Sequence, residues 1–319
     1  MSLPIDYRRI YELILRTRYL EEAIIQQHKL GKTFGPLHLC LGQEAAGVAA
    51  SAVLASEDVI TTTHRGHAHY VGKGLNLKRL CCEIWGKAEG YGQGRAGHMI
   101  IVDRQTGILP GSGIVGGGLP VAVGQALAFQ IKRERRVVVA FLGDGASNAG
   151  AFHESLNLAA LWRLPVVFFC ENNSYGLTVH VKDHLSVQDI AARSQAYNIP
   201  GLIVDGNRME EVAPVVAEAA DHARSGRGPT LIEAKTYRLH GFSTSDTGGY
   251  QREEDLACWR DRDPVKHGAD FLLKAGLATQ AEIEVMDRQA QTEVSEAVDY
   301  ALAAADPADL VLPAAVFKE

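Results

Sequence analysis

Two uninterrupted apolar runs, separated by a segment of helix length, constrain the fold of this 319-residue chain more than any other feature. Residues 137–142 read VVVAFL, and residues 166–170 read VVFFC. A strand that is apolar at every position is typical of a parallel sheet, where both faces are buried. Between the runs, Phe152, Leu156 and Ala159 recur at helical spacing. The sequence therefore predicts a strand–helix–strand unit with a parallel pair of strands.

Other segments extend this alternation along the chain. An amphipathic helix is predicted over residues 5–29, where Asp6 suits the first turn. Further helices are expected at 43–54, 121–132, 210–223 and 281–304, short strands at 59–62, 98–102, 201–205 and 230–234, and loops at 31–36, 86–97, 107–118 and 243–250. Alternating strands and helices indicate an α/β fold, with a parallel central sheet and helices on both faces.

Composition excludes several classes of protein. The net charge is −6 and the pI about 6.1. Non-specific binding of nucleic acid needs a basic face, so we do not expect this chain to bind nucleic acid. No stretch reaches the roughly 18 consecutive apolar residues of a membrane span, so no membrane association is expected. The five cysteines form no C-x-x-C pair, which argues against a disulfide framework or a zinc site. The first 22 residues lack the features of a targeting segment, so we expect a cytoplasmic protein.

Polar residues follow both apolar runs, at the points where the strands should end. Asp144 lies between Gly143 and Gly145 after the first run, and Asn173 follows the second. Since parallel strands place their carboxyl ends on one edge of a sheet, the two side chains are expected side by side. Carboxylate and amide oxygens suit Mg²⁺, which keeps positions open for phosphate oxygens. The flanking glycines let backbone N–H groups approach a phosphate. This unit therefore predicts a cradle for a metal and a diphosphate.

Residues 143–176, GDGASNAGAFHESLNLAALWRLPVVFFCENNSYG, resemble the thiamine diphosphate motif in the alpha subunits of 2-oxo acid dehydrogenase and acetoin dehydrogenase complexes. The resemblance covers nearly the whole chain. It includes HLCLGQEA from His38, ITTTHRGHAHYVGKG from Ile60, GRAGHM from Gly94, GSGIVGGG from Gly111 and TYRLHGFSTSD from Thr236. The segment from Ile60 is most similar to the acetoin branch.

The resemblance implies a fold and a set of cofactor contacts. It implies a single thiamine diphosphate-binding domain over residues 1–319, with the diphosphate–metal core at about 107–240 and a helical subunit-contact region at about 264–319. Mg²⁺ would bind Asp144, the Asn173 side chain and the backbone carbonyl of Tyr175. The other implied cofactor contacts are His64, Arg65, Gly113, Val115, Gly143, Gly145 and Ala146.

One position departs from the pattern of the family. Most relatives have H-G-H-S where this chain has H-G-F-S, so Phe242 replaces a histidine that lies near the cofactor. A phenyl ring can neither donate a hydrogen bond nor titrate. By resemblance, His38 lies at the edge of the active site, and His240 is the candidate that could substitute for the missing imidazole. His240 is equally compatible with a structural role.

The resemblance also implies partners. In this family, the glutamate that activates the cofactor lies on a beta subunit, and this sequence offers no strong candidate for it. The chain would then be half of an active site in an α₂β₂ heterotetramer. It would cleave a small 2-oxo acid or an acyloin such as acetoin, and pass the acyl group to a lipoyl acyltransferase.

Three alternatives remain open. A carboligase of secondary metabolism is compatible with Phe242, and a non-catalytic regulatory paralogue is disfavoured by the intact pair Asp144 and Asn173. A dinucleotide-dependent dehydrogenase would use the G-x-G-x-x-G patterns at residues 92–97 and 111–116. That fingerprint needs a strand before it and a helix after it, and neither site is predicted to have both.

Overall fold

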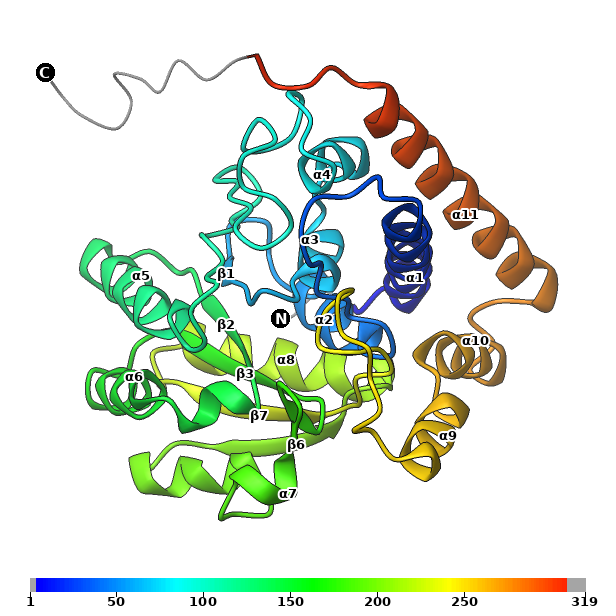
Figure 1. The fold of residues 1–319 in the computed structure, drawn as a ribbon. Helices are drawn as coiled ribbons and strands as arrows, with labels where there is room; N and C mark the ends of the chain where they lie inside the picture. The colour runs from blue at the N-terminus through cyan, green and yellow to red at the C-terminus, as the bar shows by residue number, and fades with distance from the viewer. Residues whose placement is uncertain (1–3, 309–319) are drawn as a thin grey trace, which may run out of the picture.

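A parallel sheet lies at the centre of residues 4–308, the part of the chain that the computed structural model describes (Figure 1). In this part the sheet has five strands in the order β1-β2-β3-β7-β6, and every neighbouring pair is parallel. The strands are β1 (Val59–Thr61), β2 (Val138–Gly143), β3 (Val166–Asn172), β6 (Gly201–Asp205) and β7 (Thr230–Lys235). The predicted α/β class is confirmed, and the two apolar runs are the adjacent strands β2 and β3.

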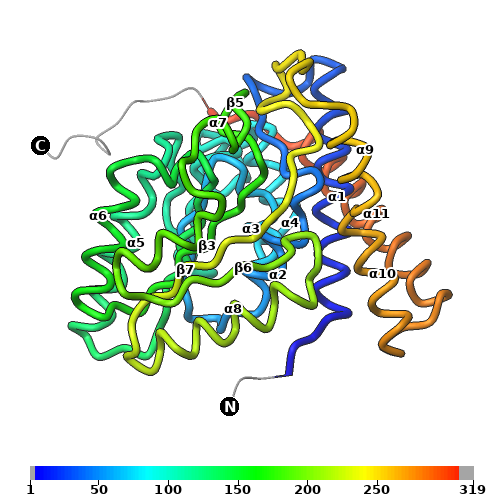
Figure 2. The backbone as a smooth tube through the Cα atoms, turned by 90° about the horizontal axis from the view of Figure 1, so that it is seen from below, coloured from blue at the N-terminus to red at the C-terminus, as the bar shows by residue number. Residues whose placement is uncertain are grey.

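Strand β2 shows why the runs are apolar throughout. Val138, Ala140 and Leu142 belong to a core shared with α5 (Gly118–Lys132) and α6 (Gly150–Leu161). The alternate residues Val139 and Phe141 belong to a second core, which includes α1 (Tyr7–Lys29), α2 (Glu44–Ala52) and α8 (Met209–Arg224). Because side chains alternate along a strand, β2 needs apolar residues at both sets of positions. Figure 2 shows α5 and α6 on one side of the sheet and α1 beyond the other.

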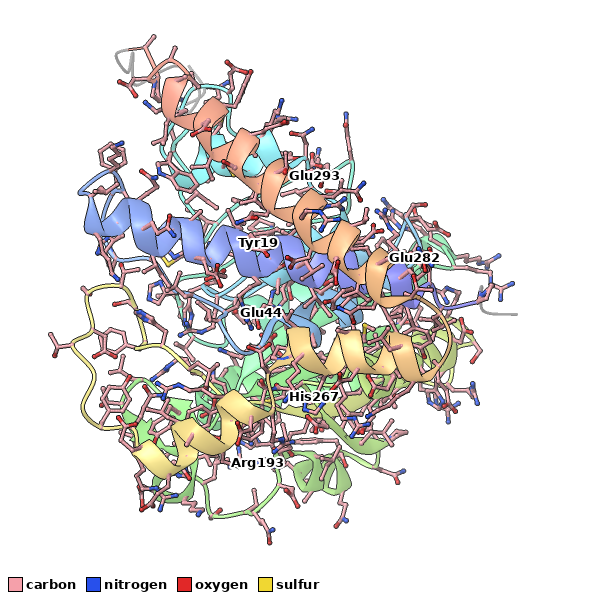
Figure 3. The ribbon with its side chains drawn as sticks, turned by 90° about the vertical axis from the view of Figure 1, so that its right-hand side faces the viewer. Tyr19, Glu44, Arg193, His267, Glu282 and Glu293 are labelled. Atoms are coloured by element: carbon pink, nitrogen blue, oxygen red, sulfur yellow. The ribbon has the colours of Figure 1, made fainter. Side chains whose placement is uncertain are left out.

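Helix α1 carries an outer layer formed by α11 (Gln280–Ala303). The two helices lie side by side, with Tyr19 on α1 and Glu293 on α11 labelled in Figure 3. The Tyr19 hydroxyl donates to Asp287 at 2.7 Å, and Arg16 pairs with Glu293 at 2.5 Å. Exposed ion pairs contribute little, so the buried apolar face of α11 is what fixes this layer. Helix α11 lies within the predicted C-terminal helical region of about 264–319, whose residues 309–319 lie outside the described part.

The sequence did not predict several short elements. These are α3 (His67–Lys73), α4 (Leu77–Ile84), α7 (Val181–His184), α9 (Glu253–Asp261), α10 (Pro264–Lys274), the hairpin strands β4 (Tyr175–Gly176) and β5 (Val179–His180), and the 3₁₀ helices η1 (Gly145–Asn148) and η2 (Ile190–Tyr197). Most of the helices span fewer than three turns and the strands have two residues each, so the periodicity of their apolar residues is difficult to recognise. No helix within residues 4–308 is both long and apolar enough to cross a membrane.

The strand predicted at residues 98–102 is wrong. This segment follows the glycine-rich loop 86–97, which is folded around the carboxylate of Glu83, a fully buried residue on α4. Backbone N–H groups of Gly92, Gly94, Ala96 and Gly97 donate to Glu83 at 2.6–3.2 Å. The first G-x-G-x-x-G pattern therefore binds an internal carboxylate and not a dinucleotide. No neighbouring strand pairs with residues 98–102 in the described structure, so they remain irregular.

Glu83→Gln should loosen this loop. The variant loses the charge that accepts four backbone donors, and hydrogen bonds to charged groups are the strong ones. We expect the free energy of unfolding to fall by about 2–3 kcal/mol in urea titrations. Amide exchange at residues 92–97 should accelerate. Glu89→Gln is the matched control, because Glu89 is exposed and in the same loop. Equal stability of the two variants would contradict the assignment.

Candidate functional site

A pocket lies at the carboxyl edge of β2 and β3, where the sequence predicts the site. In the sheet, Gly143 is paired with Glu171, so the residues that follow β2 and β3 emerge next to each other. Side chains or backbone of both Asp144 and Asn173 line the pocket. Loops from distant parts of the chain complete it, namely residues 38–43, 62–65, 112–119, 171–177 and 238–242.

Oxygen atoms that suit a hard cation converge on this pocket. Asp144 is 2% exposed, and within the described residues its carboxylate contacts one side chain, that of His184, at 3.1 Å from Oδ2 to Nε2. Asn173 is also buried, and its Nδ2 donates to Gln43 Oε1 at 3.1 Å. This contact orients the amide, so that Asn173 Oδ1 accepts the Tyr175 N–H at 3.2 Å. One carboxylate and one oriented amide oxygen form a ligand set suited to Mg²⁺.

Two buried arginines give the pocket its positive charge. Arg65 donates to the carbonyl oxygens of Leu39 and Phe242, and Arg238 to those of Tyr175 and Leu177. Neither arginine forms an ion pair with a carboxylate of the described chain. Burial, and then Arg238, lowers the pKa of Arg65 to about 10.

An uncompensated buried charge is costly, so this pocket is suited to an anion. A third polar group supports this reading, because Gln43 Nε2 is buried with no hydrogen-bond partner among the described residues. A Cβ atom at Gly145 would be in ordinary van der Waals contact with Gly176 Cα, at 3.5 Å, so glycine at position 145 leaves this space in the pocket free for a ligand.

Two imidazoles line the same wall. The rings of His38 and His64 meet edge to face, with centroids 4.8 Å apart. Burial, followed by the charge of Arg65, lowers the pKa of His38 to about 4 and that of His64 to about 3. Both rings are therefore neutral near pH 7 and can accept hydrogen bonds.

The structure brings most of the predicted site residues to this pocket. Those that line it are His38, His64, Arg65, Val115, Gly143, Asp144, Gly145, Ala146, Asn173 and Tyr175. Gly113 and His240 do not line it, whereas Phe242 does. The Nδ1 atom of His240 is buried without a described partner.

Three residues near the site were missed, namely Gln43, Arg238 and His184. Arg238 follows β7, the neighbour of β3, so the same strand-end argument could have found it. Gln43 and His184 come from a helix cap and from the short helix α7, and no local sequence signal marks them.

A pocket lined by a buried carboxylate and buried arginines, at the carboxyl edge of a parallel α/β sheet, is typical of a cofactor-dependent enzyme. Residues 12–308 match the family described as dehydrogenase E1 component, and the chain belongs to this family. The prediction from the sequence is thereby confirmed, and with it the class of a thiamine diphosphate-dependent oxidoreductase.

Relatives of both predicted branches match. The chain is 39% identical over 292 residues to the alpha subunit of acetoin:2,6-dichlorophenolindophenol oxidoreductase from Bacillus subtilis, covering 91% of this chain and 87% of that protein. The corresponding subunit from Cupriavidus necator is 36% identical over 310 residues, covering 96% and 93%. The alpha subunit of the pyruvate dehydrogenase E1 component from Porphyra purpurea is 33% identical over 305 residues, covering 93% and 89%.

Arg65→Gln should weaken anion binding. Removing one guanidinium from a buried site should cost about 1.5–3 kcal/mol, or about 10- to 150-fold in affinity. Calorimetric titration with inorganic diphosphate measures this directly. Arg252→Gln is the control, because Arg252 is exposed and pairs with Asp255 on α9. A diphosphate affinity that is unchanged in Arg65→Gln would show that the anion binds elsewhere.

Proposed function

We propose that this chain is the alpha subunit of a dehydrogenase component that depends on thiamine diphosphate and Mg²⁺. It cleaves a 2-oxo acid or acetoin and passes the acyl group to a lipoyl partner. The observation that carries the proposal is the joint occurrence of a buried carboxylate, Asp144, and two unpaired buried arginines around one pocket. A metal-bound diphosphate satisfies both kinds of charge at once.

The residues present fit this cofactor. Asp144, the Asn173 side chain and the Tyr175 carbonyl would hold Mg²⁺, and Arg65 with His64 would bind the diphosphate oxygens. The remaining proposed contacts that line the pocket are Val115, Gly143, Gly145 and Ala146; Gly113, also proposed, lies between the lining residues Ser112 and Ile114. When bound, thiamine diphosphate supplies a nucleophilic carbon and an electron sink for cleaving the bond next to a carbonyl.

The chain's own groups then bind, orient and exclude water. Arg65 and Arg238 keep their charge, because a guanidinium remains protonated even with the lowered pKa of Arg65. His38 and His64 present neutral rings to the pocket, so near pH 7 they can accept hydrogen bonds from a ligand. Phe242 covers part of the pocket wall with an apolar ring.

The distribution of acids supports an obligate beta subunit. The carboxylates that line the pocket are Asp144 and Glu171, both at the ends of β2 and β3, and Glu171 lies 3.1 Å from His69 Nε2. Gly113 and Val115 are proposed to hold the aminopyrimidine ring of the cofactor. Their segment exposes apolar side chains, with Ile114 75% and Val115 54% exposed. An exposed apolar wall of this kind suits a partner protein that also supplies the activating glutamate. We therefore propose an α₂β₂ heterotetramer, with residues 264–319 as a further subunit-contact region and a lipoyl acyltransferase as acyl acceptor.

Asp144→Ala tests the proposal. The variant removes the charged ligand, so Mg²⁺-dependent binding of thiamine diphosphate should be lost, at a cost of about 3–5 kcal/mol by analogy with a broken buried ion pair. Calorimetry on the assembled enzyme, with and without Mg²⁺, measures it. Asp183→Ala is the control, because Asp183 is an exposed acid on α7. If Asp144→Ala and the control bind the cofactor equally, the proposed function is wrong.

A carboligase is the second candidate, and one observation favours it. Phe242 lies in the pocket, at the position where the family resemblance leads us to expect histidine, while His240 does not line the pocket. An apolar ring there lacks a group to move protons during transfer to a lipoyl group. The same ring would exclude water while a second carbonyl compound reacts.

Phe242→His distinguishes the two candidates. A positioned general base is typically worth about 10²–10⁴-fold. If the histidine serves the transfer step, the variant should raise lipoamide acylation more than turnover with an artificial electron acceptor, which bypasses the lipoyl group. Phe242→Leu is the control and should raise neither rate. The contrary outcome is a wild type that already acylates lipoamide as fast as it reduces the artificial acceptor. In that case Phe242 does not impair acyl transfer, and the carboligase proposal loses its support.

A further inference from the structure

A buried histidine outside the predicted set, His98, contacts the pocket residue His38. His98 follows Gly97, the last of the loop residues whose N–H groups bind Glu83, so its backbone is held firmly. The side chain is buried, with 5% of the residue exposed. Its Nε2 lies 3.1 Å from the backbone N of His38 and 3.1 Å from His38 Nδ1.

These two contacts fix where the protons are. A backbone N–H can only donate, so the His98 Nε2 that receives the His38 N–H must be an unprotonated acceptor. His38 Nδ1 faces the lone pair of His98 Nε2. It must therefore carry a proton, because an unprotonated Nδ1 would place its own lone pair against that of Nε2. The neutral His38 ring then has a free lone pair at Nε2. In the described structure this atom has no hydrogen-bond partner and is not among the buried unpaired atoms, so it is accessible.

We propose that His98 is a positioning residue, which holds His38 in the tautomer protonated at Nδ1 so that Nε2 meets the ligand as a hydrogen-bond acceptor. This inference rests on the proposed function only for the role of His38 in binding the ligand during turnover. The tautomer itself follows from the contacts of His98. With Nε2 unprotonated, His38 accepts a hydrogen bond from a ligand hydroxyl at this atom and cannot donate one there.

The surroundings keep His98 unprotonated. Burial comes first among the causes, followed by the neighbouring His67, His38 and His64, and together they lower the pKa of His98 to about 2. Arg65, in the segment before α3, also lowers the pKa of His98. The charged and titratable groups around the pair are His64, Arg65, His67, Arg238 and, through His67, the buried Glu21.

Glu21 does not reverse this effect. Its carboxylate accepts from His67 Nδ1 at 2.6 Å and from the Cys40 N–H at 3.1 Å, and it has no hydrogen bond to His98 in the described structure. The neighbours of the His98 ring are the imidazoles of His38, His64 and His67 and the guanidinium of Arg65. All of them oppose the binding of a second proton by His98. The acceptor state of His98 is therefore stable across the neutral range.

Replacing His98 in the assembled enzyme tests the kinetic consequence. His98→Leu removes the acceptor, whereas His98→Gln offers an amide oxygen near the position of Nε2. We expect His98→Leu to lower kcat by about 10²-fold or more, with the substrate KM and the affinity for thiamine diphosphate changed only a few-fold. His98→Gln should recover most of kcat. In the double variant with His38→Ala, the loss should equal that of His38→Ala alone.

Two results would overturn the kinetic role. In one, His98→Gln folds and binds cofactor but is as slow as His98→Leu. In the other, the losses of His98→Leu and His38→Ala multiply, which indicates independent structural effects.

A second readout needs no turnover. Neutron diffraction from crystals of the assembly in D₂O should show deuterium on Nδ1 of both His38 and His98, and none on Nε2 of either ring. Deuterium on His98 Nε2 would overturn the proposal. If the protons lie as expected but neither 2-oxo acids nor acyloins are turned over, the proposed function fails while the positioning role of His98 stands.

Discussion

The parallel pairing of β2 with β3 is the constraint on which the rest of the structure depends. It places Asp144 and Asn173 at one edge of the sheet. The pairing is stable because both strands are apolar on both faces, so helices cover both sides. A polar site can then form only where the strands end, and every loop that contributes to the pocket approaches that edge. The fold thus brings Asp144, Asn173 and the two buried arginines to one edge of the sheet.

Charge balance explains why this place is a ligand site and not a structural network. Elsewhere buried acids have partners: Glu83 accepts four backbone N–H groups, and Glu44 pairs with Arg18 at 2.6 Å. In the pocket, Arg65 and Arg238 bind carbonyl oxygens, which do not neutralise them. The Asp144 carboxylate has one imidazole contact from α7. Such groups are costly to bury without a ligand, and the proposed pair of a cation and an anion would complete the charge balance.

The sequence predicted the elements whose signal is local. Val138 to Leu142 reads as a buried strand because every position is apolar, and α1 begins where Asp6 caps it, accepting from the Arg9 N–H. The motif residues Asp144 and Asn173 could be placed because strand ends in a parallel sheet follow a general rule.

What the sequence missed depends on contacts between distant segments. Residues 98–102 look like a strand, but the loop before them is bound to Glu83 on α4, and no partner strand is within reach. His98 contacts His38 across 60 positions of sequence, and Gln43 orients Asn173 across 130. No periodicity marks such pairs.

The proposed function depends most on one assignment, that Asp144, Asn173 and Tyr175 hold the metal of a thiamine diphosphate complex. A crystal structure of the assembled enzyme with thiamine diphosphate and Mn²⁺ in place of Mg²⁺ tests it most directly, because Mn²⁺ gives an anomalous signal. We predict one anomalous peak about 2.0–2.3 Å from an Asp144 carboxylate oxygen, Asn173 Oδ1 and the Tyr175 carbonyl oxygen, with His184 displaced and the diphosphate against Arg65. A cofactor bound at another place, or a peak without Asp144 as a ligand, would contradict the account.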